Sequence, residues 1–405
     1  MSINRLILLL LFLPFITYAQ TTTISGKVTT SVSHTGIGKV SVFLSNSSYG
    51  TESADDGSFH LVNVKPGQYT LVASSLGYQE YTQSVLVGRD PVTLEIPLQP
   101  KVEQLRGVVI TSAADFKKNL ELFKKEFIGT TENARKCEII NPHTINMVYH
   151  SRKLTLEAWS YDFLVVENKA LGYRVKFLID TFSTSGVSGI TQWEGKAYFE
   201  ELPGSDEQKK EWKQKRQETY YGSARNFFRS LYNNTLTQDG FIMHRLSREL
   251  NPSRPDDAVI RQKINYFQQM PRTKVNVDSF NYWISKLNMS KYYHENLSKE
   301  PLQPFQVYQQ TDKPGLFALR YTFSGCLYVI YTKRREETDF KDIYRTLDMP
   351  NYETSVLTLL APYALFDSNG VVFQNVPLIE GSWSKDKLAN LLPFDYAPGD
   401  DKGVN

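Results

Sequence analysis

The chain has 405 residues, of which 41% are hydrophobic and 22% are charged, a composition typical of folded proteins with more than one domain. Its formal net charge is only +3 at pH 7. This small charge gives no reason to expect binding to nucleic acid or to a strongly acidic partner.

The start of the chain predicts export. Arg5 supplies a positive charge, residues 6–16 form an apolar core, and small residues precede a cleavage point between Ala19 and Gln20. The apolar core is about half of the roughly 20 residues that a membrane-spanning helix needs. We therefore expect residues 1–19 to be a signal peptide and the rest to have no transmembrane helix. The expected location is the periplasm, or the cell surface in association with an outer membrane.

Residues 24–99 show the short apolar and polar alternation of antiparallel strands. Val40, Val42 and Leu44, for example, lie at every second position. Two turn signals separate such runs, Asp56-Gly57 and Pro66-Gly67. Several strands at this spacing, with no helical periodicity between them, predict a small antiparallel β-sandwich.

The order of these segments resembles the carboxypeptidase regulatory-like domain. The matching segments are Ser25–Val28, Gly38–Val42, Asp56–Phe59, Pro66–Tyr69 and Leu76–Tyr78. The resemblance implies a prealbumin-like sandwich of about seven strands, which we assign to residues 20–100. Because this domain is an accessory to many different proteins, the resemblance implies no particular activity.

Two functions found beside this domain do not fit the chain. A zinc carboxypeptidase needs a His-x-x-Glu pair, and none of the six histidines has Glu three residues on. A TonB-dependent receptor needs a plug and a barrel of about 22 strands, for which the chain after residue 112 is too short. We therefore expect no metal site and no cofactor.

Residues 113–405 are predicted to form a larger α+β domain with antiparallel sheet, joined to the sandwich by a connector over residues 101–112. Runs of alternating, β-branched and aromatic side chains mark its strands. They cover residues 153–158, 163–166, 173–179, 317–322 and 326–332. The last two runs are expected to pair with each other, and Asn369-Gly370 predicts a hairpin over residues 365–373.

Helices are predicted between these strands. The first carries an apolar stripe of Phe116, Leu120, Phe123 and Phe127, with Ser112 as its N-cap. Later helices are expected over residues 206–221, 223–231, 278–287 and 384–392. Ser205 and Gln208 form a capping box at the start of the second helix, and Pro393 ends the last one.

Five patches beyond the sandwich resemble an uncharacterised group of exported bacterial proteins that couple this sandwich to a second domain. They are residues 127–137, 140–142, 167–173, 222–231 and 391–396. The resemblance implies a shared architecture and no activity. Polar residues within the patches are candidates for a pocket: Asn133, Asn141, Glu167, Asn168, Arg225 and Arg229. The alternative is structural, with asparagines in turns and arginines bridging elements.

Cys137 and Cys326 are the only cysteines. In an exported protein they could form one disulfide, or they could remain buried thiols. Cys137 could also act as a nucleophile if a distant histidine meets it in the fold.

The remaining catalytic motifs are absent, so no catalytic residue is assigned. The sequence contains no nucleophile elbow, phosphate loop or dinucleotide fingerprint. We expect a non-enzymatic binding or scaffold protein for an envelope protein or a glycan. The alternatives are a periplasmic or surface hydrolase with a site in residues 130–396, and an outer-membrane-associated protein. A deep polar pocket with a perturbed pKa would favour hydrolysis, and an exposed aromatic face would favour binding.

Overall fold

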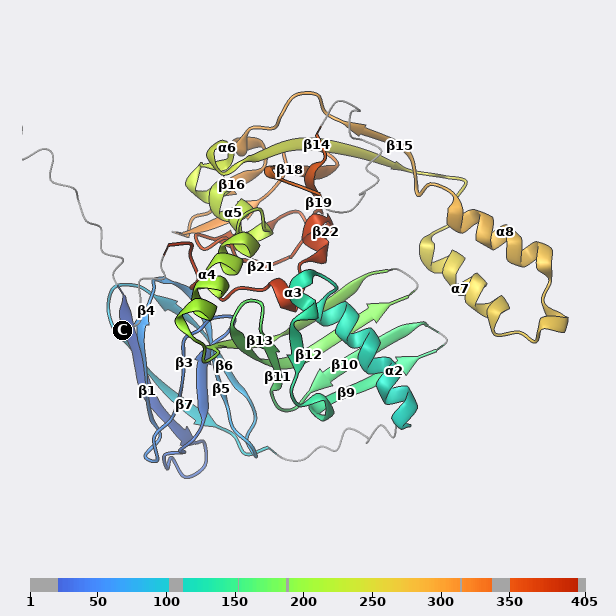
Figure 1. The fold of residues 1–405 in the computed structure, drawn as a ribbon. Coiled ribbons are helices and arrows are strands. Elements are labelled where there is room, and N and C mark those ends of the chain that lie inside the picture. The colour runs from blue at the N-terminus through green and yellow to red at the C-terminus, as the bar shows by residue number, and fades with distance from the viewer. Residues whose placement is uncertain are drawn as a thin grey trace, which may run out of the picture. The chain divides into compact units, whose positions relative to one another are not determined.

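The structure is a computed structural model. It describes residues 21–101, 112–151, 153–186, 189–313, 315–336 and 350–399. The predicted signal peptide, the cleavage point at Ala19 and Gln20, and most of the connector lie outside the described residues. The chain forms two compact units, Met1–Val42 with Thr51–Pro100, and Phe43–Gly50 with Lys101–Asn405 (Figure 1).

The N-terminal region has seven strands in two sheets, as predicted for the sandwich. One sheet has the order β4-β1-β7 and the other β3-β2-β5-β6. The strands are β1 (Thr22–Thr30), β2 (Ser41–Leu44), β3 (Gly50–Glu52), β4 (Ser58–Val64), β5 (Gly67–Ser74), β6 (Tyr81–Val87) and β7 (Val92–Leu98). β1 pairs with β4 in antiparallel and with β7 in parallel orientation. The sandwich was expected to be antiparallel, and the β1–β7 pair departs from that expectation.

The apolar residues that alternate with polar ones along the predicted strands are the residues whose side chains are buried. Phe59, Leu61 and Val64 of β4 are buried, while His60 is exposed. The predicted turn before β4 requires a glycine, because Gly57 has a φ of +86° and a Cβ on it would lie 2.2 Å from the carbonyl oxygen of Val28.

The larger unit begins with a six-stranded sheet of order β8-β11-β12-β10-β9, in which β13 also pairs with β12. The strands are β8 (Cys137–Ile139), β9 (Ile145–His150), β10 (Thr155–Ser160), β11 (Leu164–Asn168), β12 (Tyr173–Ser185) and β13 (Thr191–Glu201). The strand pairs of this sheet are antiparallel, which confirms the predicted α+β class.

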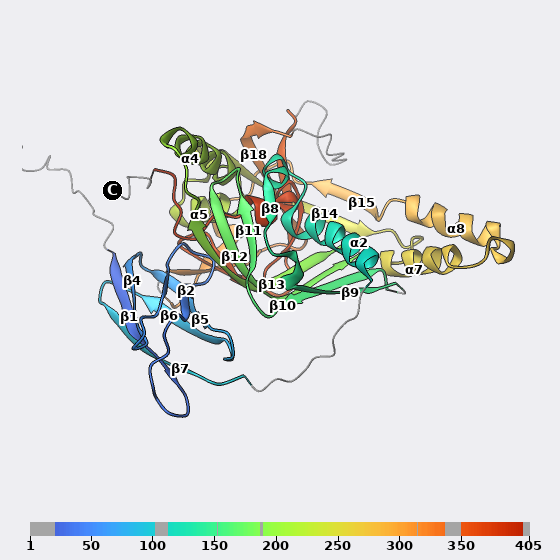
Figure 2. The same cartoon turned by 60° about the horizontal axis from the view of Figure 1, so that its bottom comes forward.

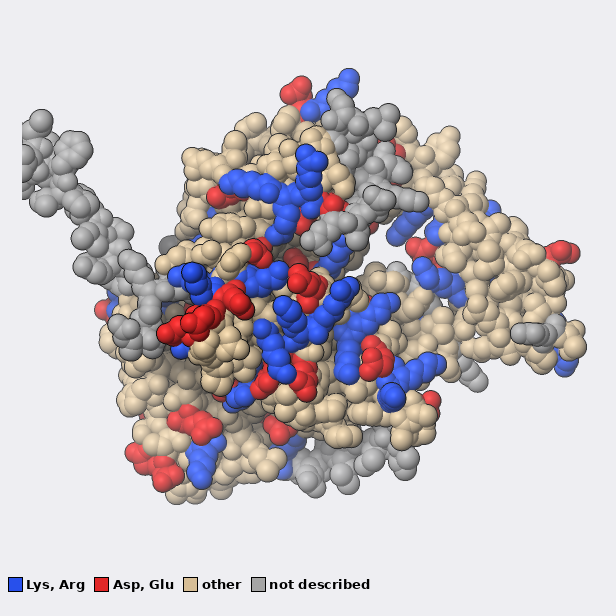
Figure 3. Space-filling view, viewed as in Figure 1, with Lys and Arg blue, Asp and Glu red and all other residues tan. Residues whose placement is uncertain are grey.

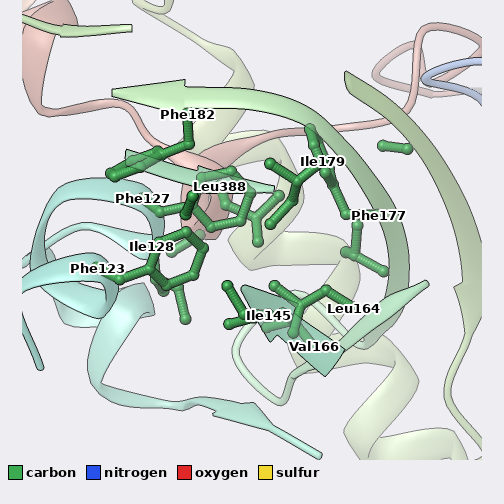
Figure 4. Close-up of a cluster of buried hydrophobic side chains, with 14 of the residues drawn as sticks. Phe123, Phe127, Ile128, Ile145, Leu164, Val166, Phe177, Ile179, Phe182 and Leu388 are labelled. Atoms are coloured by element: carbon green, nitrogen blue, oxygen red, sulfur yellow. The ribbon is translucent and has the colours of Figure 1, made fainter. Parts of the chain in front are cut away.

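The first helix of this unit, α2 (Ala113–Phe123), supplies the aromatic core beside the sheet. Its N-cap is Ser112, whose side chain accepts a hydrogen bond from the backbone of Asp115, as predicted. The helix continues as a π-helical turn, η1 (Lys124–Ile128). Phe123 and Phe127 are fully buried against Phe177 and Phe182 (Figure 4).

Two further antiparallel sheets complete the larger unit, in the orders β15-β14-β18-β19-β22 and β16-β17-β20-β21. The first contains β14 (Phe241–Leu250), β15 (Tyr292–Leu297), β18 (Cys326–Arg335), β19 (Tyr352–Thr358) and β22 (Leu378–Gly381). The second contains β16 (Tyr308–Gln310), β17 (Leu316–Leu319), β20 (Ala364–Asp367) and β21 (Val372–Gln374). The predicted hairpin at Asn369-Gly370 is confirmed as β20 and β21.

The expected pairing of residues 317–322 with 326–332 is wrong, because the two runs belong to different sheets. β17 pairs with β16 and β20, whereas β18 pairs with β14 and β19. The connection passes from one sheet to the other at Gly325, which has a φ of +119° and where a Cβ would lie 2.5 Å from the carbonyl oxygen of Leu246. Gly325 therefore lets the chain pass close to the backbone of β14 where it changes sheet, and it does not form a hairpin turn.

The remaining helices agree with the sequence in part. They are α3 (Glu132–Arg135), α4 (Asp206–Tyr220), α5 (Ala224–Asn233), α6 (Leu236–Asp239), α7 (Asp257–Gln268) and α8 (Val277–Asn288). Single 3₁₀ turns occur at η2 (Pro142–Thr144), η3 (Arg272–Lys274) and η4 (Pro304–Gln306). The capping box of Ser205 and Gln208 is confirmed at α4. The sequence analysis missed α7.

The predicted helix over residues 384–392 is wrong. Two 3₁₀ turns, η5 (Ser382–Lys385) and η6 (Leu388–Asn390), take its place. The carbonyl oxygen of Ala389 would have no α-helical donor, because residue 393 is a proline, and it accepts a hydrogen bond from Asn168 instead.

Charged side chains of both signs are mixed over the face shown in Figure 3. Ion pairs join neighbouring strands of the six-stranded sheet, such as Lys176 with Glu200 and Lys196 with Asp180. Such exposed pairs contribute little stability. Within the described ranges, no helix combines the length and apolarity needed to cross a membrane.

Candidate functional site

Asn168, one of the predicted pocket residues, holds the C-terminal segment in place. It is only 2% exposed, and its Nδ2 donates to the carbonyl oxygen of Ala389 at 2.9 Å. Its Oδ1 accepts from the backbone N–H groups of Ala170 and Leu171 at 3.2 and 3.1 Å. The side chain therefore shapes the β11–β12 connection and fixes η6 against it.

Asn133 holds the same segment from α3. Its Nδ2 donates to Oδ1 of Asn390 at 2.9 Å and to Oγ1 of Thr219 at 3.2 Å. The Nδ2 of Asn390 in turn donates to Oδ1 of Asp386 at 2.7 Å. A chain of side-chain hydrogen bonds thus links α3 and α4 to residues 386–390.

Arg225 of α5 binds the end of that segment. Its guanidinium donates to the carbonyl oxygens of Asn369, Pro393, Phe394 and Tyr396 at 3.2, 2.6, 2.5 and 2.7 Å. Burial lowers the pKa of Arg225. With four carbonyl acceptors around it, this side chain is already occupied by the fold.

The other three candidates lie elsewhere. Asn141 pairs with the edge of β11, donating to the carbonyl oxygen of Phe163 and accepting from the N–H of Val165, both at 2.8 Å. Glu167 accepts from Arg174 at 2.8 Å across β11 and β12. For half-buried Arg229, the described part of the chain supplies no side-chain hydrogen bond or ion pair. The six residues therefore do not line one pocket. All except Arg229 use their polar groups to hold turns or to join segments of the chain, which is the structural alternative given above.

The two cysteines are not joined. Both are free thiols. Cys137 starts β8 and donates from Sγ to the carbonyl oxygen of Asn133 at 3.4 Å, whereas Cys326 starts β18 in another sheet and accepts from Thr358 at 3.2 Å. The sulfur of Cys137 thus bonds to α3, and that of Cys326 to the neighbouring strand β19. Burial raises the pKa of Cys137 to about 12, so this thiol is not activated as a nucleophile.

Thiol titration in a buffer without reductant tests this assignment. With a pKa of about 12, roughly one Cys137 thiol in ten thousand is ionised at pH 8. We expect both thiols to react in denaturant, and Cys137 to react with a disulfide reagent in the folded protein far more slowly than an exposed cysteine. If the denatured protein had no free thiol, a disulfide would be present and the assignment would be wrong.

Three partly buried carboxyl groups, those of Glu336, Glu353 and Asp386, cluster around η5. Burial raises the pKa of Asp386 to about 6 and also raises the pKa of Glu353. Arg334 donates to Glu353 at 2.7 Å, and Lys385 contacts Glu336 at 2.5 Å. The carboxyl groups come from separate segments and share no motif, so no sequence signal could have found them.

The described residues hold no group of three or more His, Cys, Asp or Glu side chains arranged to bind a metal ion. The cluster around Asp386 can hold a proton, but no activated nucleophile has been located beside it. The arrangement therefore offers a titratable carboxyl group with a raised pKa.

Exposed apolar side chains lie in the segments that adjoin one end of the sheet β16-β17-β20-β21. The pairs Tyr308↔Leu319, Leu319↔Ala364 and Leu365↔Gln374 bring the start of β16, the start of β20 and the end of β21 to this end of the sheet. The side chains in these segments are Phe305, Leu360, Tyr363 and Val376, which are 72%, 74%, 39% and 56% exposed. We call these four side chains the apolar rim.

The rim is built from the loops that end the strands. Phe305, Tyr363 and Val376 each lie next to a proline in the sequence, and proline fixes the backbone and prevents the strand from continuing. The repeated pairing of an apolar residue with proline was the signal that could have found this surface. A group of exposed apolar side chains at one place is typical of an interaction site.

Comparison with known proteins identifies one domain. Residues 24–110 match the family model of the CarboxypepD_reg-like domain. No curated protein matches the chain.

Three solved structures show weak similarity. The pilus 2b backbone protein of group B streptococcus is 16% identical, with 20% of this chain and 42% of that chain covered and a TM-score of 0.19. A type II cohesin–X-dockerin complex from Acetivibrio cellulolyticus is 19% identical over 28% of this chain and 79% of that chain, with a TM-score of 0.19. A DUF3823 family protein from Bacteroides uniformis is 13% identical over 45% of this chain and all of that chain, with a TM-score of 0.15. These similarities are too low to bear on fold or function.

Proposed function

We propose, from the premise that residues 24–110 form a CarboxypepD_reg-like domain, that this protein is exported and binds a macromolecule of the cell envelope without catalysing a reaction. Residues 1–19 would direct it to the periplasm or the cell surface. The CarboxypepD_reg-like domain is an accessory module in this proposal, and the larger unit supplies the binding surface.

The observation that carries the proposal is the apolar rim. Phe305 and Leu360 are both more than 70% exposed at the same end of a sheet, where burial by a partner would remove a large apolar area from water. The rim includes aliphatic side chains, such as Leu360 and Val376, and these suit a protein partner better than a glycan. An envelope protein is therefore the first candidate and a glycan the second.

The surroundings of the predicted pocket residues support binding over hydrolysis. Asn133, Asn168 and Arg225 use their polar groups to hold residues 386–396, and the raised pKa of Cys137 keeps its thiol protonated. A hydrolase site in residues 130–396 would therefore need catalytic side chains other than these four.

Capture from envelope extracts tests the proposal. The mature chain is immobilised as the native sequence, as Phe305→Ser/Leu360→Ser, and as the control Leu86→Ser, whose side chain is 72% exposed on β6. We expect the native chain and the control to retain one envelope protein, and the double variant to retain at least about tenfold less. A glycan array run with the same three proteins tests the second candidate. The proposal would be contradicted if the rim variant and the control captured equal amounts. It would also be contradicted if the native chain retained no protein and no glycan.

A further inference from the structure

Helices α7 and α8 form a projecting arm. They pack side by side and extend away from the sheets of the larger unit in both views (Figures 1 and 2). Arg254 fixes the base of the arm by donating to the carbonyl oxygen of Met289 at 2.9 Å, and Asn265, in the last turn of α7, donates to the carbonyl oxygen of Ser151 at 3.4 Å. We call residues 257–288, the two helices and their connection, the arm.

The outer half of the arm exposes apolar side chains. Tyr266, Val277 and Tyr282, which lie within about two turns of the connection, are 57%, 63% and 51% exposed. Pro271 in the connection is also exposed. Helix α8 contains no buried residue along its 12-residue length, which is unusual for a helix stabilised by packing. Ile264 on the same part of α7 is buried, whereas Tyr266, Val277 and Tyr282 remain exposed to solvent.

The arm is also basic. Its sequence contains five Lys and Arg residues and two Asp residues, so its formal charge of +3 equals that of the whole chain. One of the two acids, Asp257, already pairs with Arg254 at 2.6 Å. Lys263 and Lys274 are exposed on the outer half. Few charged side chains cover the arm on the face shown in Figure 3, so that face combines apolar and uncharged polar groups.

We propose that the tip of the arm inserts into an anionic lipid surface. Exposed Tyr and Val side chains on a helix pair enter the boundary between headgroups and acyl chains, while lysines beside them contact anionic headgroups. The projecting position suits a flat and extended partner, because a convex tip can reach a bilayer without a pocket. The surface is separate from the apolar rim, so this inference goes beyond the proposed function and does not depend on it.

The positive charge of the arm also argues against a second copy of this chain as its binding partner. A symmetric contact would bring two arms of formal charge +3 together, and juxtaposed like charges oppose association. An acidic protein would also satisfy the charge, and vesicle flotation distinguishes it from a lipid surface, because binding to a protein does not require a vesicle.

Vesicle flotation with the mature chain tests the inference. The vesicles contain phosphatidylethanolamine with phosphatidylglycerol, or phosphatidylcholine alone. We expect the native chain to float with the anionic vesicles, more weakly as salt increases, and not with the neutral ones. Tyr266→Ser/Val277→Ser/Tyr282→Ser should abolish flotation, and Lys263→Gln/Lys274→Gln should weaken partitioning by about thirtyfold.

Two controls make the result specific. The rim variant Phe305→Ser/Leu360→Ser should float like the native chain, and circular dichroism should show unchanged folding of the arm variants. Brominated lipids should quench fluorescence from the native chain more than from Trp283→Phe, which removes the tryptophan of the arm. The inference is overturned if no vesicle binds, if neutral and anionic vesicles bind equally, or if the arm variants bind like the native chain. Capture of an acidic protein by the arm without vesicle binding would overturn it as well.

Discussion

Arg225→Ala is expected to lower the free energy of unfolding by about 3 to 5 kcal/mol. The change removes the donor for the carbonyl oxygens of Pro393, Phe394 and Tyr396, together with that of Asn369. These acceptors would be left with fewer partners in a partly buried place, which costs more than the loss of an exposed hydrogen bond. Urea unfolding followed by circular dichroism measures the difference.

Two variants show whether the effect belongs to the guanidinium. Arg225→Lys should recover only part of the stability, because an ammonium group cannot reach four acceptors in the planar arrangement of arginine. Arg229→Ala is the matched control, one turn along the same helix, and should change the free energy of unfolding by less than about 0.5 kcal/mol. If Arg225→Ala and Arg229→Ala were equally stable, Arg225 would not fix the C-terminal segment.

Asp386→Asn is expected to stabilise the protein at pH 8 by about 3 kcal/mol, and to have little effect below pH 4. Burial raises the pKa of Asp386 to about 6, from the usual 3.8 of an aspartate side chain. Between these two values the folded state holds a proton that the unfolded state has released. The stabilisation from Asp386 is therefore complete at low pH and is lost as the pH rises through 6. Asparagine carries no charge to bury and can still accept from Asn390.

The test compares urea unfolding of the native chain and Asp386→Asn at pH 4, 6 and 8, so that other titrating groups cancel. Asp312→Asn, at an exposed aspartate, should differ from the native chain by less than about 0.5 kcal/mol at each pH. A stability difference for Asp386→Asn that does not depend on pH would show that the Asp386 carboxyl does not titrate in this way.

The sequence predicted those parts of the fold that depend on local chemistry. Alternation and turn residues found the strands of the sandwich, because buried and exposed side chains alternate along each strand. The N-cap at Ser112 and the capping box at Ser205 were found because both involve residues only three positions apart.

The parts that sequence analysis could not predict depend on distant partners. Asn133 and Asn168 bind residues that lie 257 and 221 positions along the chain. A single sequence shows that such polar residues lie among aromatic ones, but it does not show whether they face a ligand or another segment of the chain. The same limit applies to β17 and β18, whose alternation identified two strands but not the sheet to which each belongs.

The apolar rim was missed for a different reason. Phe305 lies in the short turn η4 and Leu360 in a loop, where periodicity gives no signal, and exposure is a property of the folded chain. Only the sheet registers bring these two segments to the same end of the sheet. Apolar residues beside prolines at predicted strand ends are thus worth considering as surface sites.

Photo-crosslinking in the native cell envelope tests the central claim most directly. A photoreactive amino acid replaces Leu360 in the rim or, as the reference, Leu86 on β6. If the rim is the binding surface, position 360 should give one major adduct with an envelope macromolecule and position 86 should not. The same adducts at both positions, or no adduct at position 360, would contradict it.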